Sequence, residues 1–188
     1  QSVWLDFISR NLIISGELRE LVDRGLRGGT SNPSIFEKAI AGSTEYNEDL
    51  KRLVEEGKMV DEIYESLVID EIRSAADILL PIHRETSGLD GYVSLEVNPN
   101  LAYDTESTIR EARRLNAALN RPNVMIKVPA TTAGMPAIET LIGEGVNVNV
   151  TLIFSLQQYE EVTGAYISGL KKLALSGGDV AKVASVAS

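Results

Sequence analysis

The sequence contains no cysteine and only one histidine, His83. Without cysteine, the chain has no disulfide, no thiolate nucleophile and no cysteine-ligated metal site. A single histidine also excludes a metal site built from several imidazoles, so no metal site is expected. His83 falls within a helical pattern, where a surface position or a satisfied hydrogen bond explains it.

Positive charge is also scarce. Lysine and arginine total 18 against 27 aspartates and glutamates, a formal net charge of -9. Nucleic-acid-binding surfaces need clustered positive charge, so we expect no nucleic acid partner. No apolar run approaches membrane-spanning length and no signal-peptide pattern occurs, which predicts a cytoplasmic protein with no membrane partner. The first residue is Gln1 rather than methionine, so we expect a partial sequence.

The 188 residues are enough for one domain with a sizeable core. Strand-like runs alternate with helical patterns, which predicts parallel strands joined by right-handed crossovers. Neither GxGxxG nor a P-loop is present, so a nucleotide-binding doubly wound sheet loses support. The strand-like runs are 3–7, 29–32, 92–98, 124–130 and 146–154, with the start of a sixth from Val183. The helical patterns are 15–24, 34–40, 43–56, 60–84, 105–119, 136–143 and 156–175.

Polar residues occupy one face of successive predicted strands, because side chains alternate across a strand with a period of two. Parallel sheets covered by helices on both faces usually read as continuous apolar runs. A closed barrel explains the difference, since its inner face can line a site. An antiparallel sheet with one wet face would also alternate, but the intervening helices argue against it. The polar residues concerned are Asp6, Glu96, Lys127, Asn149 and Thr151.

Lys127 stands out because it lies inside the apolar run "NVMIKVP". Removing a lysine amine from bulk water disfavours its charged form, and a neutral amine can attack a carbonyl carbon to form a Schiff base. Two nearby carboxylates, Asp6 and Glu96, could move the protons that this chemistry needs. Asn149 and Thr151 could hold a polyhydroxy substrate.

Structural explanations exist for each of these residues. Lys127 could extend to solvent or blunt a sheet edge at the end of its strand, which Pro129 helps to terminate. Glu96 could form a purely structural ion pair with Lys127. Asn149 and Thr151 could fill the barrel interior.

Helix capping offers a further alternative. Asn32 before Pro33 is typical of a helix N-cap followed by proline at the first helical position, and Glu37 three residues after Ser34 hints at a capping box. Asp6 could likewise cap the helix that follows it.

Five motifs, in order along the whole chain, resemble those of the transaldolase family: "SVWLDFISR", "GGTSNPSIFEKAI", "SLEVNPNLAYDT", "MIKVPATTAG" and "VNVNVTLIFSLQQY". The resemblance implies a class I aldolase-like (β/α)8 TIM barrel of the pentose phosphate pathway. Such enzymes move a dihydroxyacetone unit between sugar phosphates, from fructose 6-phosphate or sedoheptulose 7-phosphate to an aldose phosphate. The family uses no metal or organic cofactor.

The resemblance also implies roles for individual residues. Lys127 matches the Schiff-base lysine. Glu96 matches the acid/base carboxylate that works through a bound water. Asp6, placed in the first strand, matches the carboxylate that takes the hydroxyl proton as the carbon–carbon bond breaks.

Three further residues match substrate-binding positions of the family. Asn32 and Asn149 match the amides that hold the dihydroxyacetone hydroxyls, and Thr151 matches the residue that positions the water. Asn32 could therefore both cap a helix and bind substrate. Relatives that act as fructose 6-phosphate aldolases carry glutamine at the position of Glu96, so this glutamate favours transaldolase.

A complete (β/α)8 barrel typically needs about 250 residues, and this chain provides only five to six βα units. We therefore expect residues 1–188 to be a single, partial barrel domain without the family's phosphate-binding segment. Such a piece should associate with itself or with the missing part, and should have little activity alone. Alternatives are a fructose 6-phosphate aldolase-like enzyme, a catalytically inactive fragment, or the transaldolase portion of a fusion, for example with glucose-6-phosphate isomerase.

Overall fold

The computed structural model describes residues 2–188, which divide into two compact units. The first unit ends at Val93 and the second is Ser94–Ser188, so strand β3 (Tyr92–Glu96) crosses the boundary. The first unit holds β1 (Val3–Leu5), α1 (Arg10–Ile14), α2 (Glu17–Asp23), β2 (Leu26–Thr30), α3 (Pro33–Ala41), α4 (Asn47–Glu55) and α5 (Val60–Glu85).

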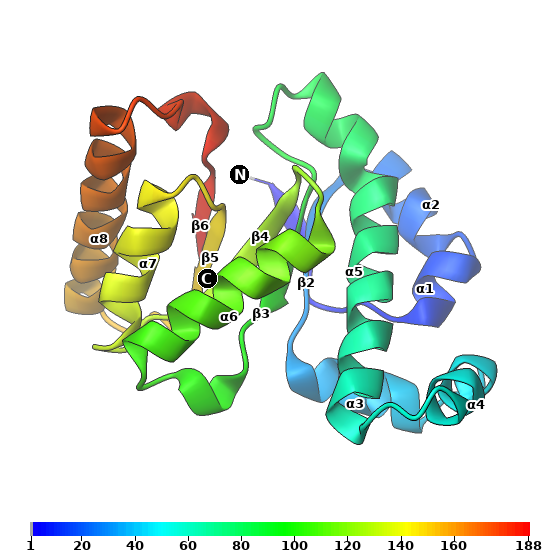
Figure 1. Ribbon diagram of the computed structural model, residues 1–188. Helices are drawn as coiled ribbons and strands as arrows, with labels where there is room; N and C mark the ends of the chain where they lie inside the picture. The colour runs from blue at the N-terminus through cyan, green and yellow to red at the C-terminus, as the bar shows by residue number, and fades with distance from the viewer. Residues whose placement is uncertain (1) are drawn as a thin grey trace. The chain divides into compact units, whose positions relative to one another are not determined.

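The second unit continues the alternation of strands and helices. After β3 it holds the 3-10 turn η1 (Pro99–Leu101), α6 (Thr105–Leu119), β4 (Val124–Pro129), α7 (Gly134–Gly143), β5 (Val148–Thr151), α8 (Leu156–Leu175), η2 (Val180–Lys182) and β6 (Ser185–Ala187). Figure 1 shows α7 and α8 side by side, and these two helices pack closely.

The strands follow one another in the sheet in the order of the sequence, β1 to β6. The pairs β1/β2, β4/β5 and β5/β6 are parallel. Parallel strands in sequence order, separated from one another by helical segments, are the topology of a (β/α)8 barrel. The predicted fold class, a partial (β/α)8 barrel, is therefore confirmed, with six strands in residues 2–188.

Strand β2 shows why glycine is needed at one position of the sheet. Trp4 of β1 lies opposite Gly28 of β2 in the register. A β-carbon on Gly28 would collide with the indole ring of Trp4. The glycine thus allows the large aromatic ring to lie directly against the neighbouring strand.

The long helices match their predicted patterns. In α5, the predicted stripe buries Val68, Ile72, Ala75 and Leu79, whereas Tyr64 is only partly buried. In α6, the predicted bounds and the four predicted core positions are confirmed. Those core positions are Ile109, Ala112, Leu115 and Leu119.

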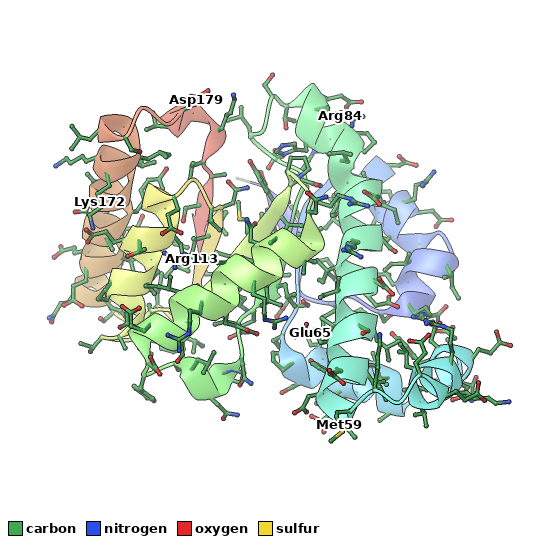
Figure 2. All side chains as sticks on the ribbon, viewed as in Figure 1. Met59, Glu65, Arg84, Arg113, Lys172 and Asp179 are labelled. Carbon is green, nitrogen blue, oxygen red and sulfur yellow. The ribbon has the colours of Figure 1, made fainter. Side chains whose placement is uncertain are left out.

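Surface ion pairs link the helices of the second unit. Arg113 of α6 pairs with Glu144, which follows α7, and Lys172 of α8 pairs with Glu139 of α7 at 2.6 Å. Figure 2 labels both basic side chains. Exposed pairs of this kind contribute little to stability, so the packing between these helices depends mainly on their buried apolar side chains.

Several predicted boundaries are wrong. Strand β1 ends at Leu5, so Asp6 follows the strand instead of lying in it. Strand β2 spans Leu26–Thr30 rather than 29–32, and helix α4 begins at Asn47 rather than at 43. Strand β5 is also shorter than the predicted run. Helix α1 was not predicted at all.

Burial corrects the expected pattern of one apolar and one polar face. Every residue of β4 and β5 is buried, including the polar ones. In contrast, Val3 of β1 is 66% exposed although it belongs to the predicted helix-covered face. None of the helices within residues 2–188 is both long and apolar enough to span a membrane.

Candidate active site

Lys127 lies in the middle of β4 and is buried. Its Nζ atom is 3.4 Å from Oε2 of Glu96, and the two side chains are only 10% and 13% exposed. The alternative in which Lys127 extends to solvent is therefore wrong. A buried lysine beside a carboxylate fits either an ion pair or a reactive amine with a proton-transfer partner.

The backbone of the second unit fixes these two side chains. Glu96 is the last residue of β3, and the next backbone N–H, of Val97, donates to the Lys127 carbonyl at 3.1 Å. This bond joins the end of β3 to β4 beside the lysine. The Lys127–Glu96 contact thus follows from the pairing of two strands and does not depend on a flexible loop.

Asn149 of β5 lies opposite Lys127 in the β4/β5 register and is 1% exposed. Its Nδ2 atom donates to Oγ of Ser94 at 3.0 Å, and its Oδ1 atom accepts from Oγ of Ser188 at 2.9 Å. The amide therefore joins side chains from β3 and from the end of β6. A buried amide that is hydrogen-bonded at both its nitrogen and its oxygen holds a fixed orientation.

Thr151 is two residues beyond Asn149 and is also buried. The alternation along β5 places both on one face of the strand. The Thr151 carbonyl accepts from the Ala130 N–H at 2.8 Å, which ties the end of β5 to the end of β4. The second unit thus gathers four predicted site residues on adjoining strands: Glu96, Lys127, Asn149 and Thr151.

The other two predicted residues, Asp6 and Asn32, belong to the first unit. Asp6 is exposed, in the segment between β1 and α1. The idea that it caps the next helix is wrong, because Ser9 is the N-cap of α1 and accepts from the Leu12 N–H at 3.3 Å. Asn32 does cap α3: its Oδ1 atom accepts from the Ile35 N–H at 3.0 Å.

Two serines that contact Asn149 were missing from the predicted site. Ser94 is completely buried, and Ser188 follows β6. The sequence could have predicted Ser94 as a site residue, since it lies two residues before Glu96 and therefore shares its face of β3. No sequence pattern indicated Ser188, because it lies beyond a strand of which only the start was expected.

A second cluster of buried and partly buried charges lies in the first unit and contains no predicted site residue. Glu71 of α5 is 4% exposed, and its Oε1 atom accepts from Nε of Arg10 at 2.7 Å. Burial raises the pKa of the Glu71 carboxyl, against the effect of the hydrogen bond from Arg10. Arg10 also bonds Asp49 of α4 at 2.7 Å and stacks on the Tyr46 ring, 4.4 Å from its centroid. These contacts join α1, α4 and α5.

His83 and the acidic residues offer no metal centre within residues 2–188. No three of their side chains gather in a group that could hold an ion. His83 is a satisfied helix residue, as expected: its Nδ1 atom lies 3.2 Å from the Asp90 carbonyl, and its ring meets the Tyr92 ring edge-on. The arrangement around Lys127 instead suits attack of an amine on a carbonyl carbon, with a carboxylate to move protons.

Comparison with known proteins covers almost the whole chain. A family model described as Transaldolase/Fructose-6-phosphate aldolase matches residues 3–188. A transaldolase of Trichodesmium erythraeum is 54% identical over 189 residues, which cover 100% of this chain and 50% of that protein.

Two other bacterial relatives are similar at the same level. Transaldolase 2 of a Nostoc species is 52% identical, with 100% of this chain and 50% of that protein covered. A transaldolase of Thiobacillus denitrificans is 51% identical, with 100% and 53% covered. The chain spans about half the length of the curated relatives that it matches.

Proposed function

Because the chain belongs to the transaldolase/fructose-6-phosphate aldolase family, we propose that it carries the Schiff-base centre of a transaldolase. Lys127 is the nucleophile, and Glu96 is its proton-transfer partner. The observation that carries the proposal is the buried Lys127 amine, held 3.4 Å from the Glu96 carboxylate by the pairing of β3 with β4.

In the first step, the Lys127 amine, having given a proton to Glu96, attacks the ketone carbon of a ketose phosphate and forms a carbinolamine. Loss of water then gives a protonated imine. Glu96 supplies and removes the protons of these steps, through a bound water positioned by Thr151. Such a carboxylate must lie within reach of the amine, directly or through one water, and catalytic hydrogen bonds are often longer before substrate binds. The 3.4 Å between Glu96 Oε2 and Lys127 Nζ supports this role.

In the second step, the bond between C3 and C4 of the ketose breaks. Asp6 takes the proton of the C4 hydroxyl, an aldose phosphate leaves, and the electron pair moves into the imine to give an enamine on Lys127. The enamine then attacks an acceptor aldehyde in the reverse sequence of steps, and hydrolysis of the new imine releases the product ketose. No electrons enter or leave over the cycle.

The amides of Asn149 and Asn32 hold the hydroxyls of the dihydroxyacetone unit. Asn149 is suited to this because its orientation is already fixed by Ser94 and Ser188. Asn32 would contribute from its position as the N-cap of α3. This assignment requires Asp6 and Asn32 to join the four residues of the second unit in one barrel domain.

The substrates and the cellular setting are part of the same proposal. Sugar phosphates of the pentose phosphate pathway are the proposed substrates, in the cytoplasm, with no cofactor. The proposed partner of this piece is a second copy or the remainder of the barrel. An open sheet edge at β1 or β6 would favour such association, because an unpaired strand edge can pair with another strand.

A transfer assay tests the proposal. The protein expressed from its whole natural reading frame should convert fructose 6-phosphate and erythrose 4-phosphate to sedoheptulose 7-phosphate and glyceraldehyde 3-phosphate. Lys127→Met should abolish the reaction, whereas Lys171→Met, on the surface of α8, should leave it unchanged. Full activity of the Lys127→Met protein would refute the proposal.

The alternative activity within the family is aldol cleavage without transfer. Relatives that act as fructose 6-phosphate aldolases carry glutamine at this position, so Glu96 favours transfer over cleavage. Measuring free dihydroxyacetone released from fructose 6-phosphate without an acceptor distinguishes the two. Rapid release at the rate of the transfer reaction would assign the aldolase activity instead.

A further inference from the structure

The side-chain amide of Gln158, in the first turn of α8, joins the carboxyl ends of β4 and β5. Its Nε2 atom donates to the Ala130 carbonyl at 2.6 Å and to the Leu152 carbonyl at 3.0 Å. Its Oε1 atom accepts from the Phe154 N–H at 2.8 Å. The donors and the acceptor of this amide are therefore all engaged with backbone groups.

The segment held by Gln158 has an unusual backbone. Leu152 has a backbone φ angle of 64°, in the left-handed region that residues other than glycine rarely adopt. It directly follows Thr151 at the end of β5. Conformations of this kind persist only where surrounding contacts hold them, and they cluster at functional sites. Gln158 bonds the chain at Leu152 and at Phe154, so it supplies such contacts.

Helix capping explains only part of this arrangement. Ser155 is the N-cap of α8, and Gln158 is the third helical residue, the spacing of a capping box. A capping role needs only the amide oxygen, which accepts a backbone N–H at the helix start. It does not need the two N–H donors, one of which reaches across to the end of β4. Glutamate would serve for capping but could not donate to the Ala130 carbonyl.

The bond to Ala130 extends the β4/β5 pairing beyond the last ladder pair. Lys127 lies opposite Asn149 and Pro129 opposite Thr151 in the register. The next residue, Ala130, donates its N–H to the Thr151 carbonyl, and its own carbonyl accepts from Gln158. The amide thus fixes the two strand ends that carry the proposed nucleophile and the proposed water-positioning threonine.

We propose that Gln158 is a positioning residue, which holds Thr151 and Lys127 in reactive register through the backbone and does not touch the substrate. This inference rests on the proposed function. A displacement of about 1 Å at a reacting group can lower a rate about a hundredfold. Loss of the three Gln158 hydrogen bonds should therefore slow the formation of the Schiff base more than it weakens substrate binding.

The test compares three variants of the protein expressed from its whole natural reading frame. Gln158→Glu keeps the acceptor oxygen and the helix start but removes both donors. Gln158→Met keeps the length of the side chain and removes every hydrogen bond. Gln157→Glu is the control, because it makes the same charge change one residue away, where the exposed Gln157 amide donates to Glu161 at 3.1 Å within its own helix.

The expected result is a fall in kcat of about tenfold to a hundredfold in both Gln158 variants, with KM changed by less than about threefold. The rate of borohydride-trapped imine formation should fall equally, and circular dichroism should show folded protein. The control should match the unmodified protein.

Unchanged kcat in both Gln158 variants would overturn the inference. Loss of activity that merely follows loss of folded protein would also overturn it, because it would assign a purely structural role. An unmodified protein that forms no imine would refute the proposed function itself, and this inference with it.

Discussion

The interaction between Lys127 and Glu96 can be measured as a coupling free energy in unfolding experiments, independently of any enzyme assay. Coulomb's law at the observed 3.4 Å gives about 1.2 kcal/mol in bulk water and about 5 kcal/mol at an effective dielectric constant of 20. Both side chains are nearly excluded from solvent, at 10% and 13% exposure. We therefore expect a coupling energy between these limits, at about 2–4 kcal/mol.

A double-mutant cycle with Lys127→Met and Glu96→Gln measures this coupling by urea unfolding at pH 7, followed by circular dichroism. The matched control is the Lys172–Glu139 pair, changed to methionine and glutamine. That pair is shorter, at 2.6 Å, but its side chains are 59% and 31% exposed. Solvent screening should reduce its coupling to below about 1 kcal/mol. A buried pair that couples no more strongly than the exposed pair would refute the geometry on which the active-site assignment depends.

Three further predictions concern stability. Asn149→Leu removes the amide that bonds Ser94 and should lower the free energy of unfolding by about 1–3 kcal/mol in urea titrations; an unchanged midpoint would contradict the described network. Asp104→Ala removes the N-cap of α6 and should cost about 1 kcal/mol by the same assay, whereas no loss would mean that the cap is not formed. A hydrogen bond from Arg10 lowers the pKa of Asp49 below its ordinary 3.8, so its carboxylate stabilises the fold above that value and loses this effect as the pH falls through the folded-state pKa. Asp49→Asn should therefore lower Tm more at pH 7 than in acid below pH 3.8, and a loss that does not shrink as the pH falls would contradict the sign of the shift.

The long elements could be predicted from the sequence because their signals are strong. Helices α6 and α8 have the predicted bounds, since each follows a capping residue and repeats apolar positions over several turns. Strand β4 could be predicted because its sequence is apolar at every position except Lys127. The short helix α1 was missed because five residues hold too little periodicity, although Ser9 offered a capping signal.

The candidate site could be predicted only where strand alternation applies. Lys127 and Asn149 lie opposite each other in the β4/β5 register, so their side chains lie on the same face of the sheet. Glu96 and Ser94 are two residues apart in β3, so they also share one face of their strand. Gln158 was not predicted as part of the site. Its role depends on a carbonyl 28 residues away in the sequence, and no local pattern indicates such a contact.

The most direct measurement of the central claim is the chemical identity of the residue that binds the ketose. The protein from its whole natural reading frame should be treated with fructose 6-phosphate and borohydride, digested and mapped by mass spectrometry. The account predicts one reduced adduct, on the peptide that contains Lys127, and none on that peptide when the ketose is left out. An adduct on another lysine, or none at all in a folded protein, would contradict it.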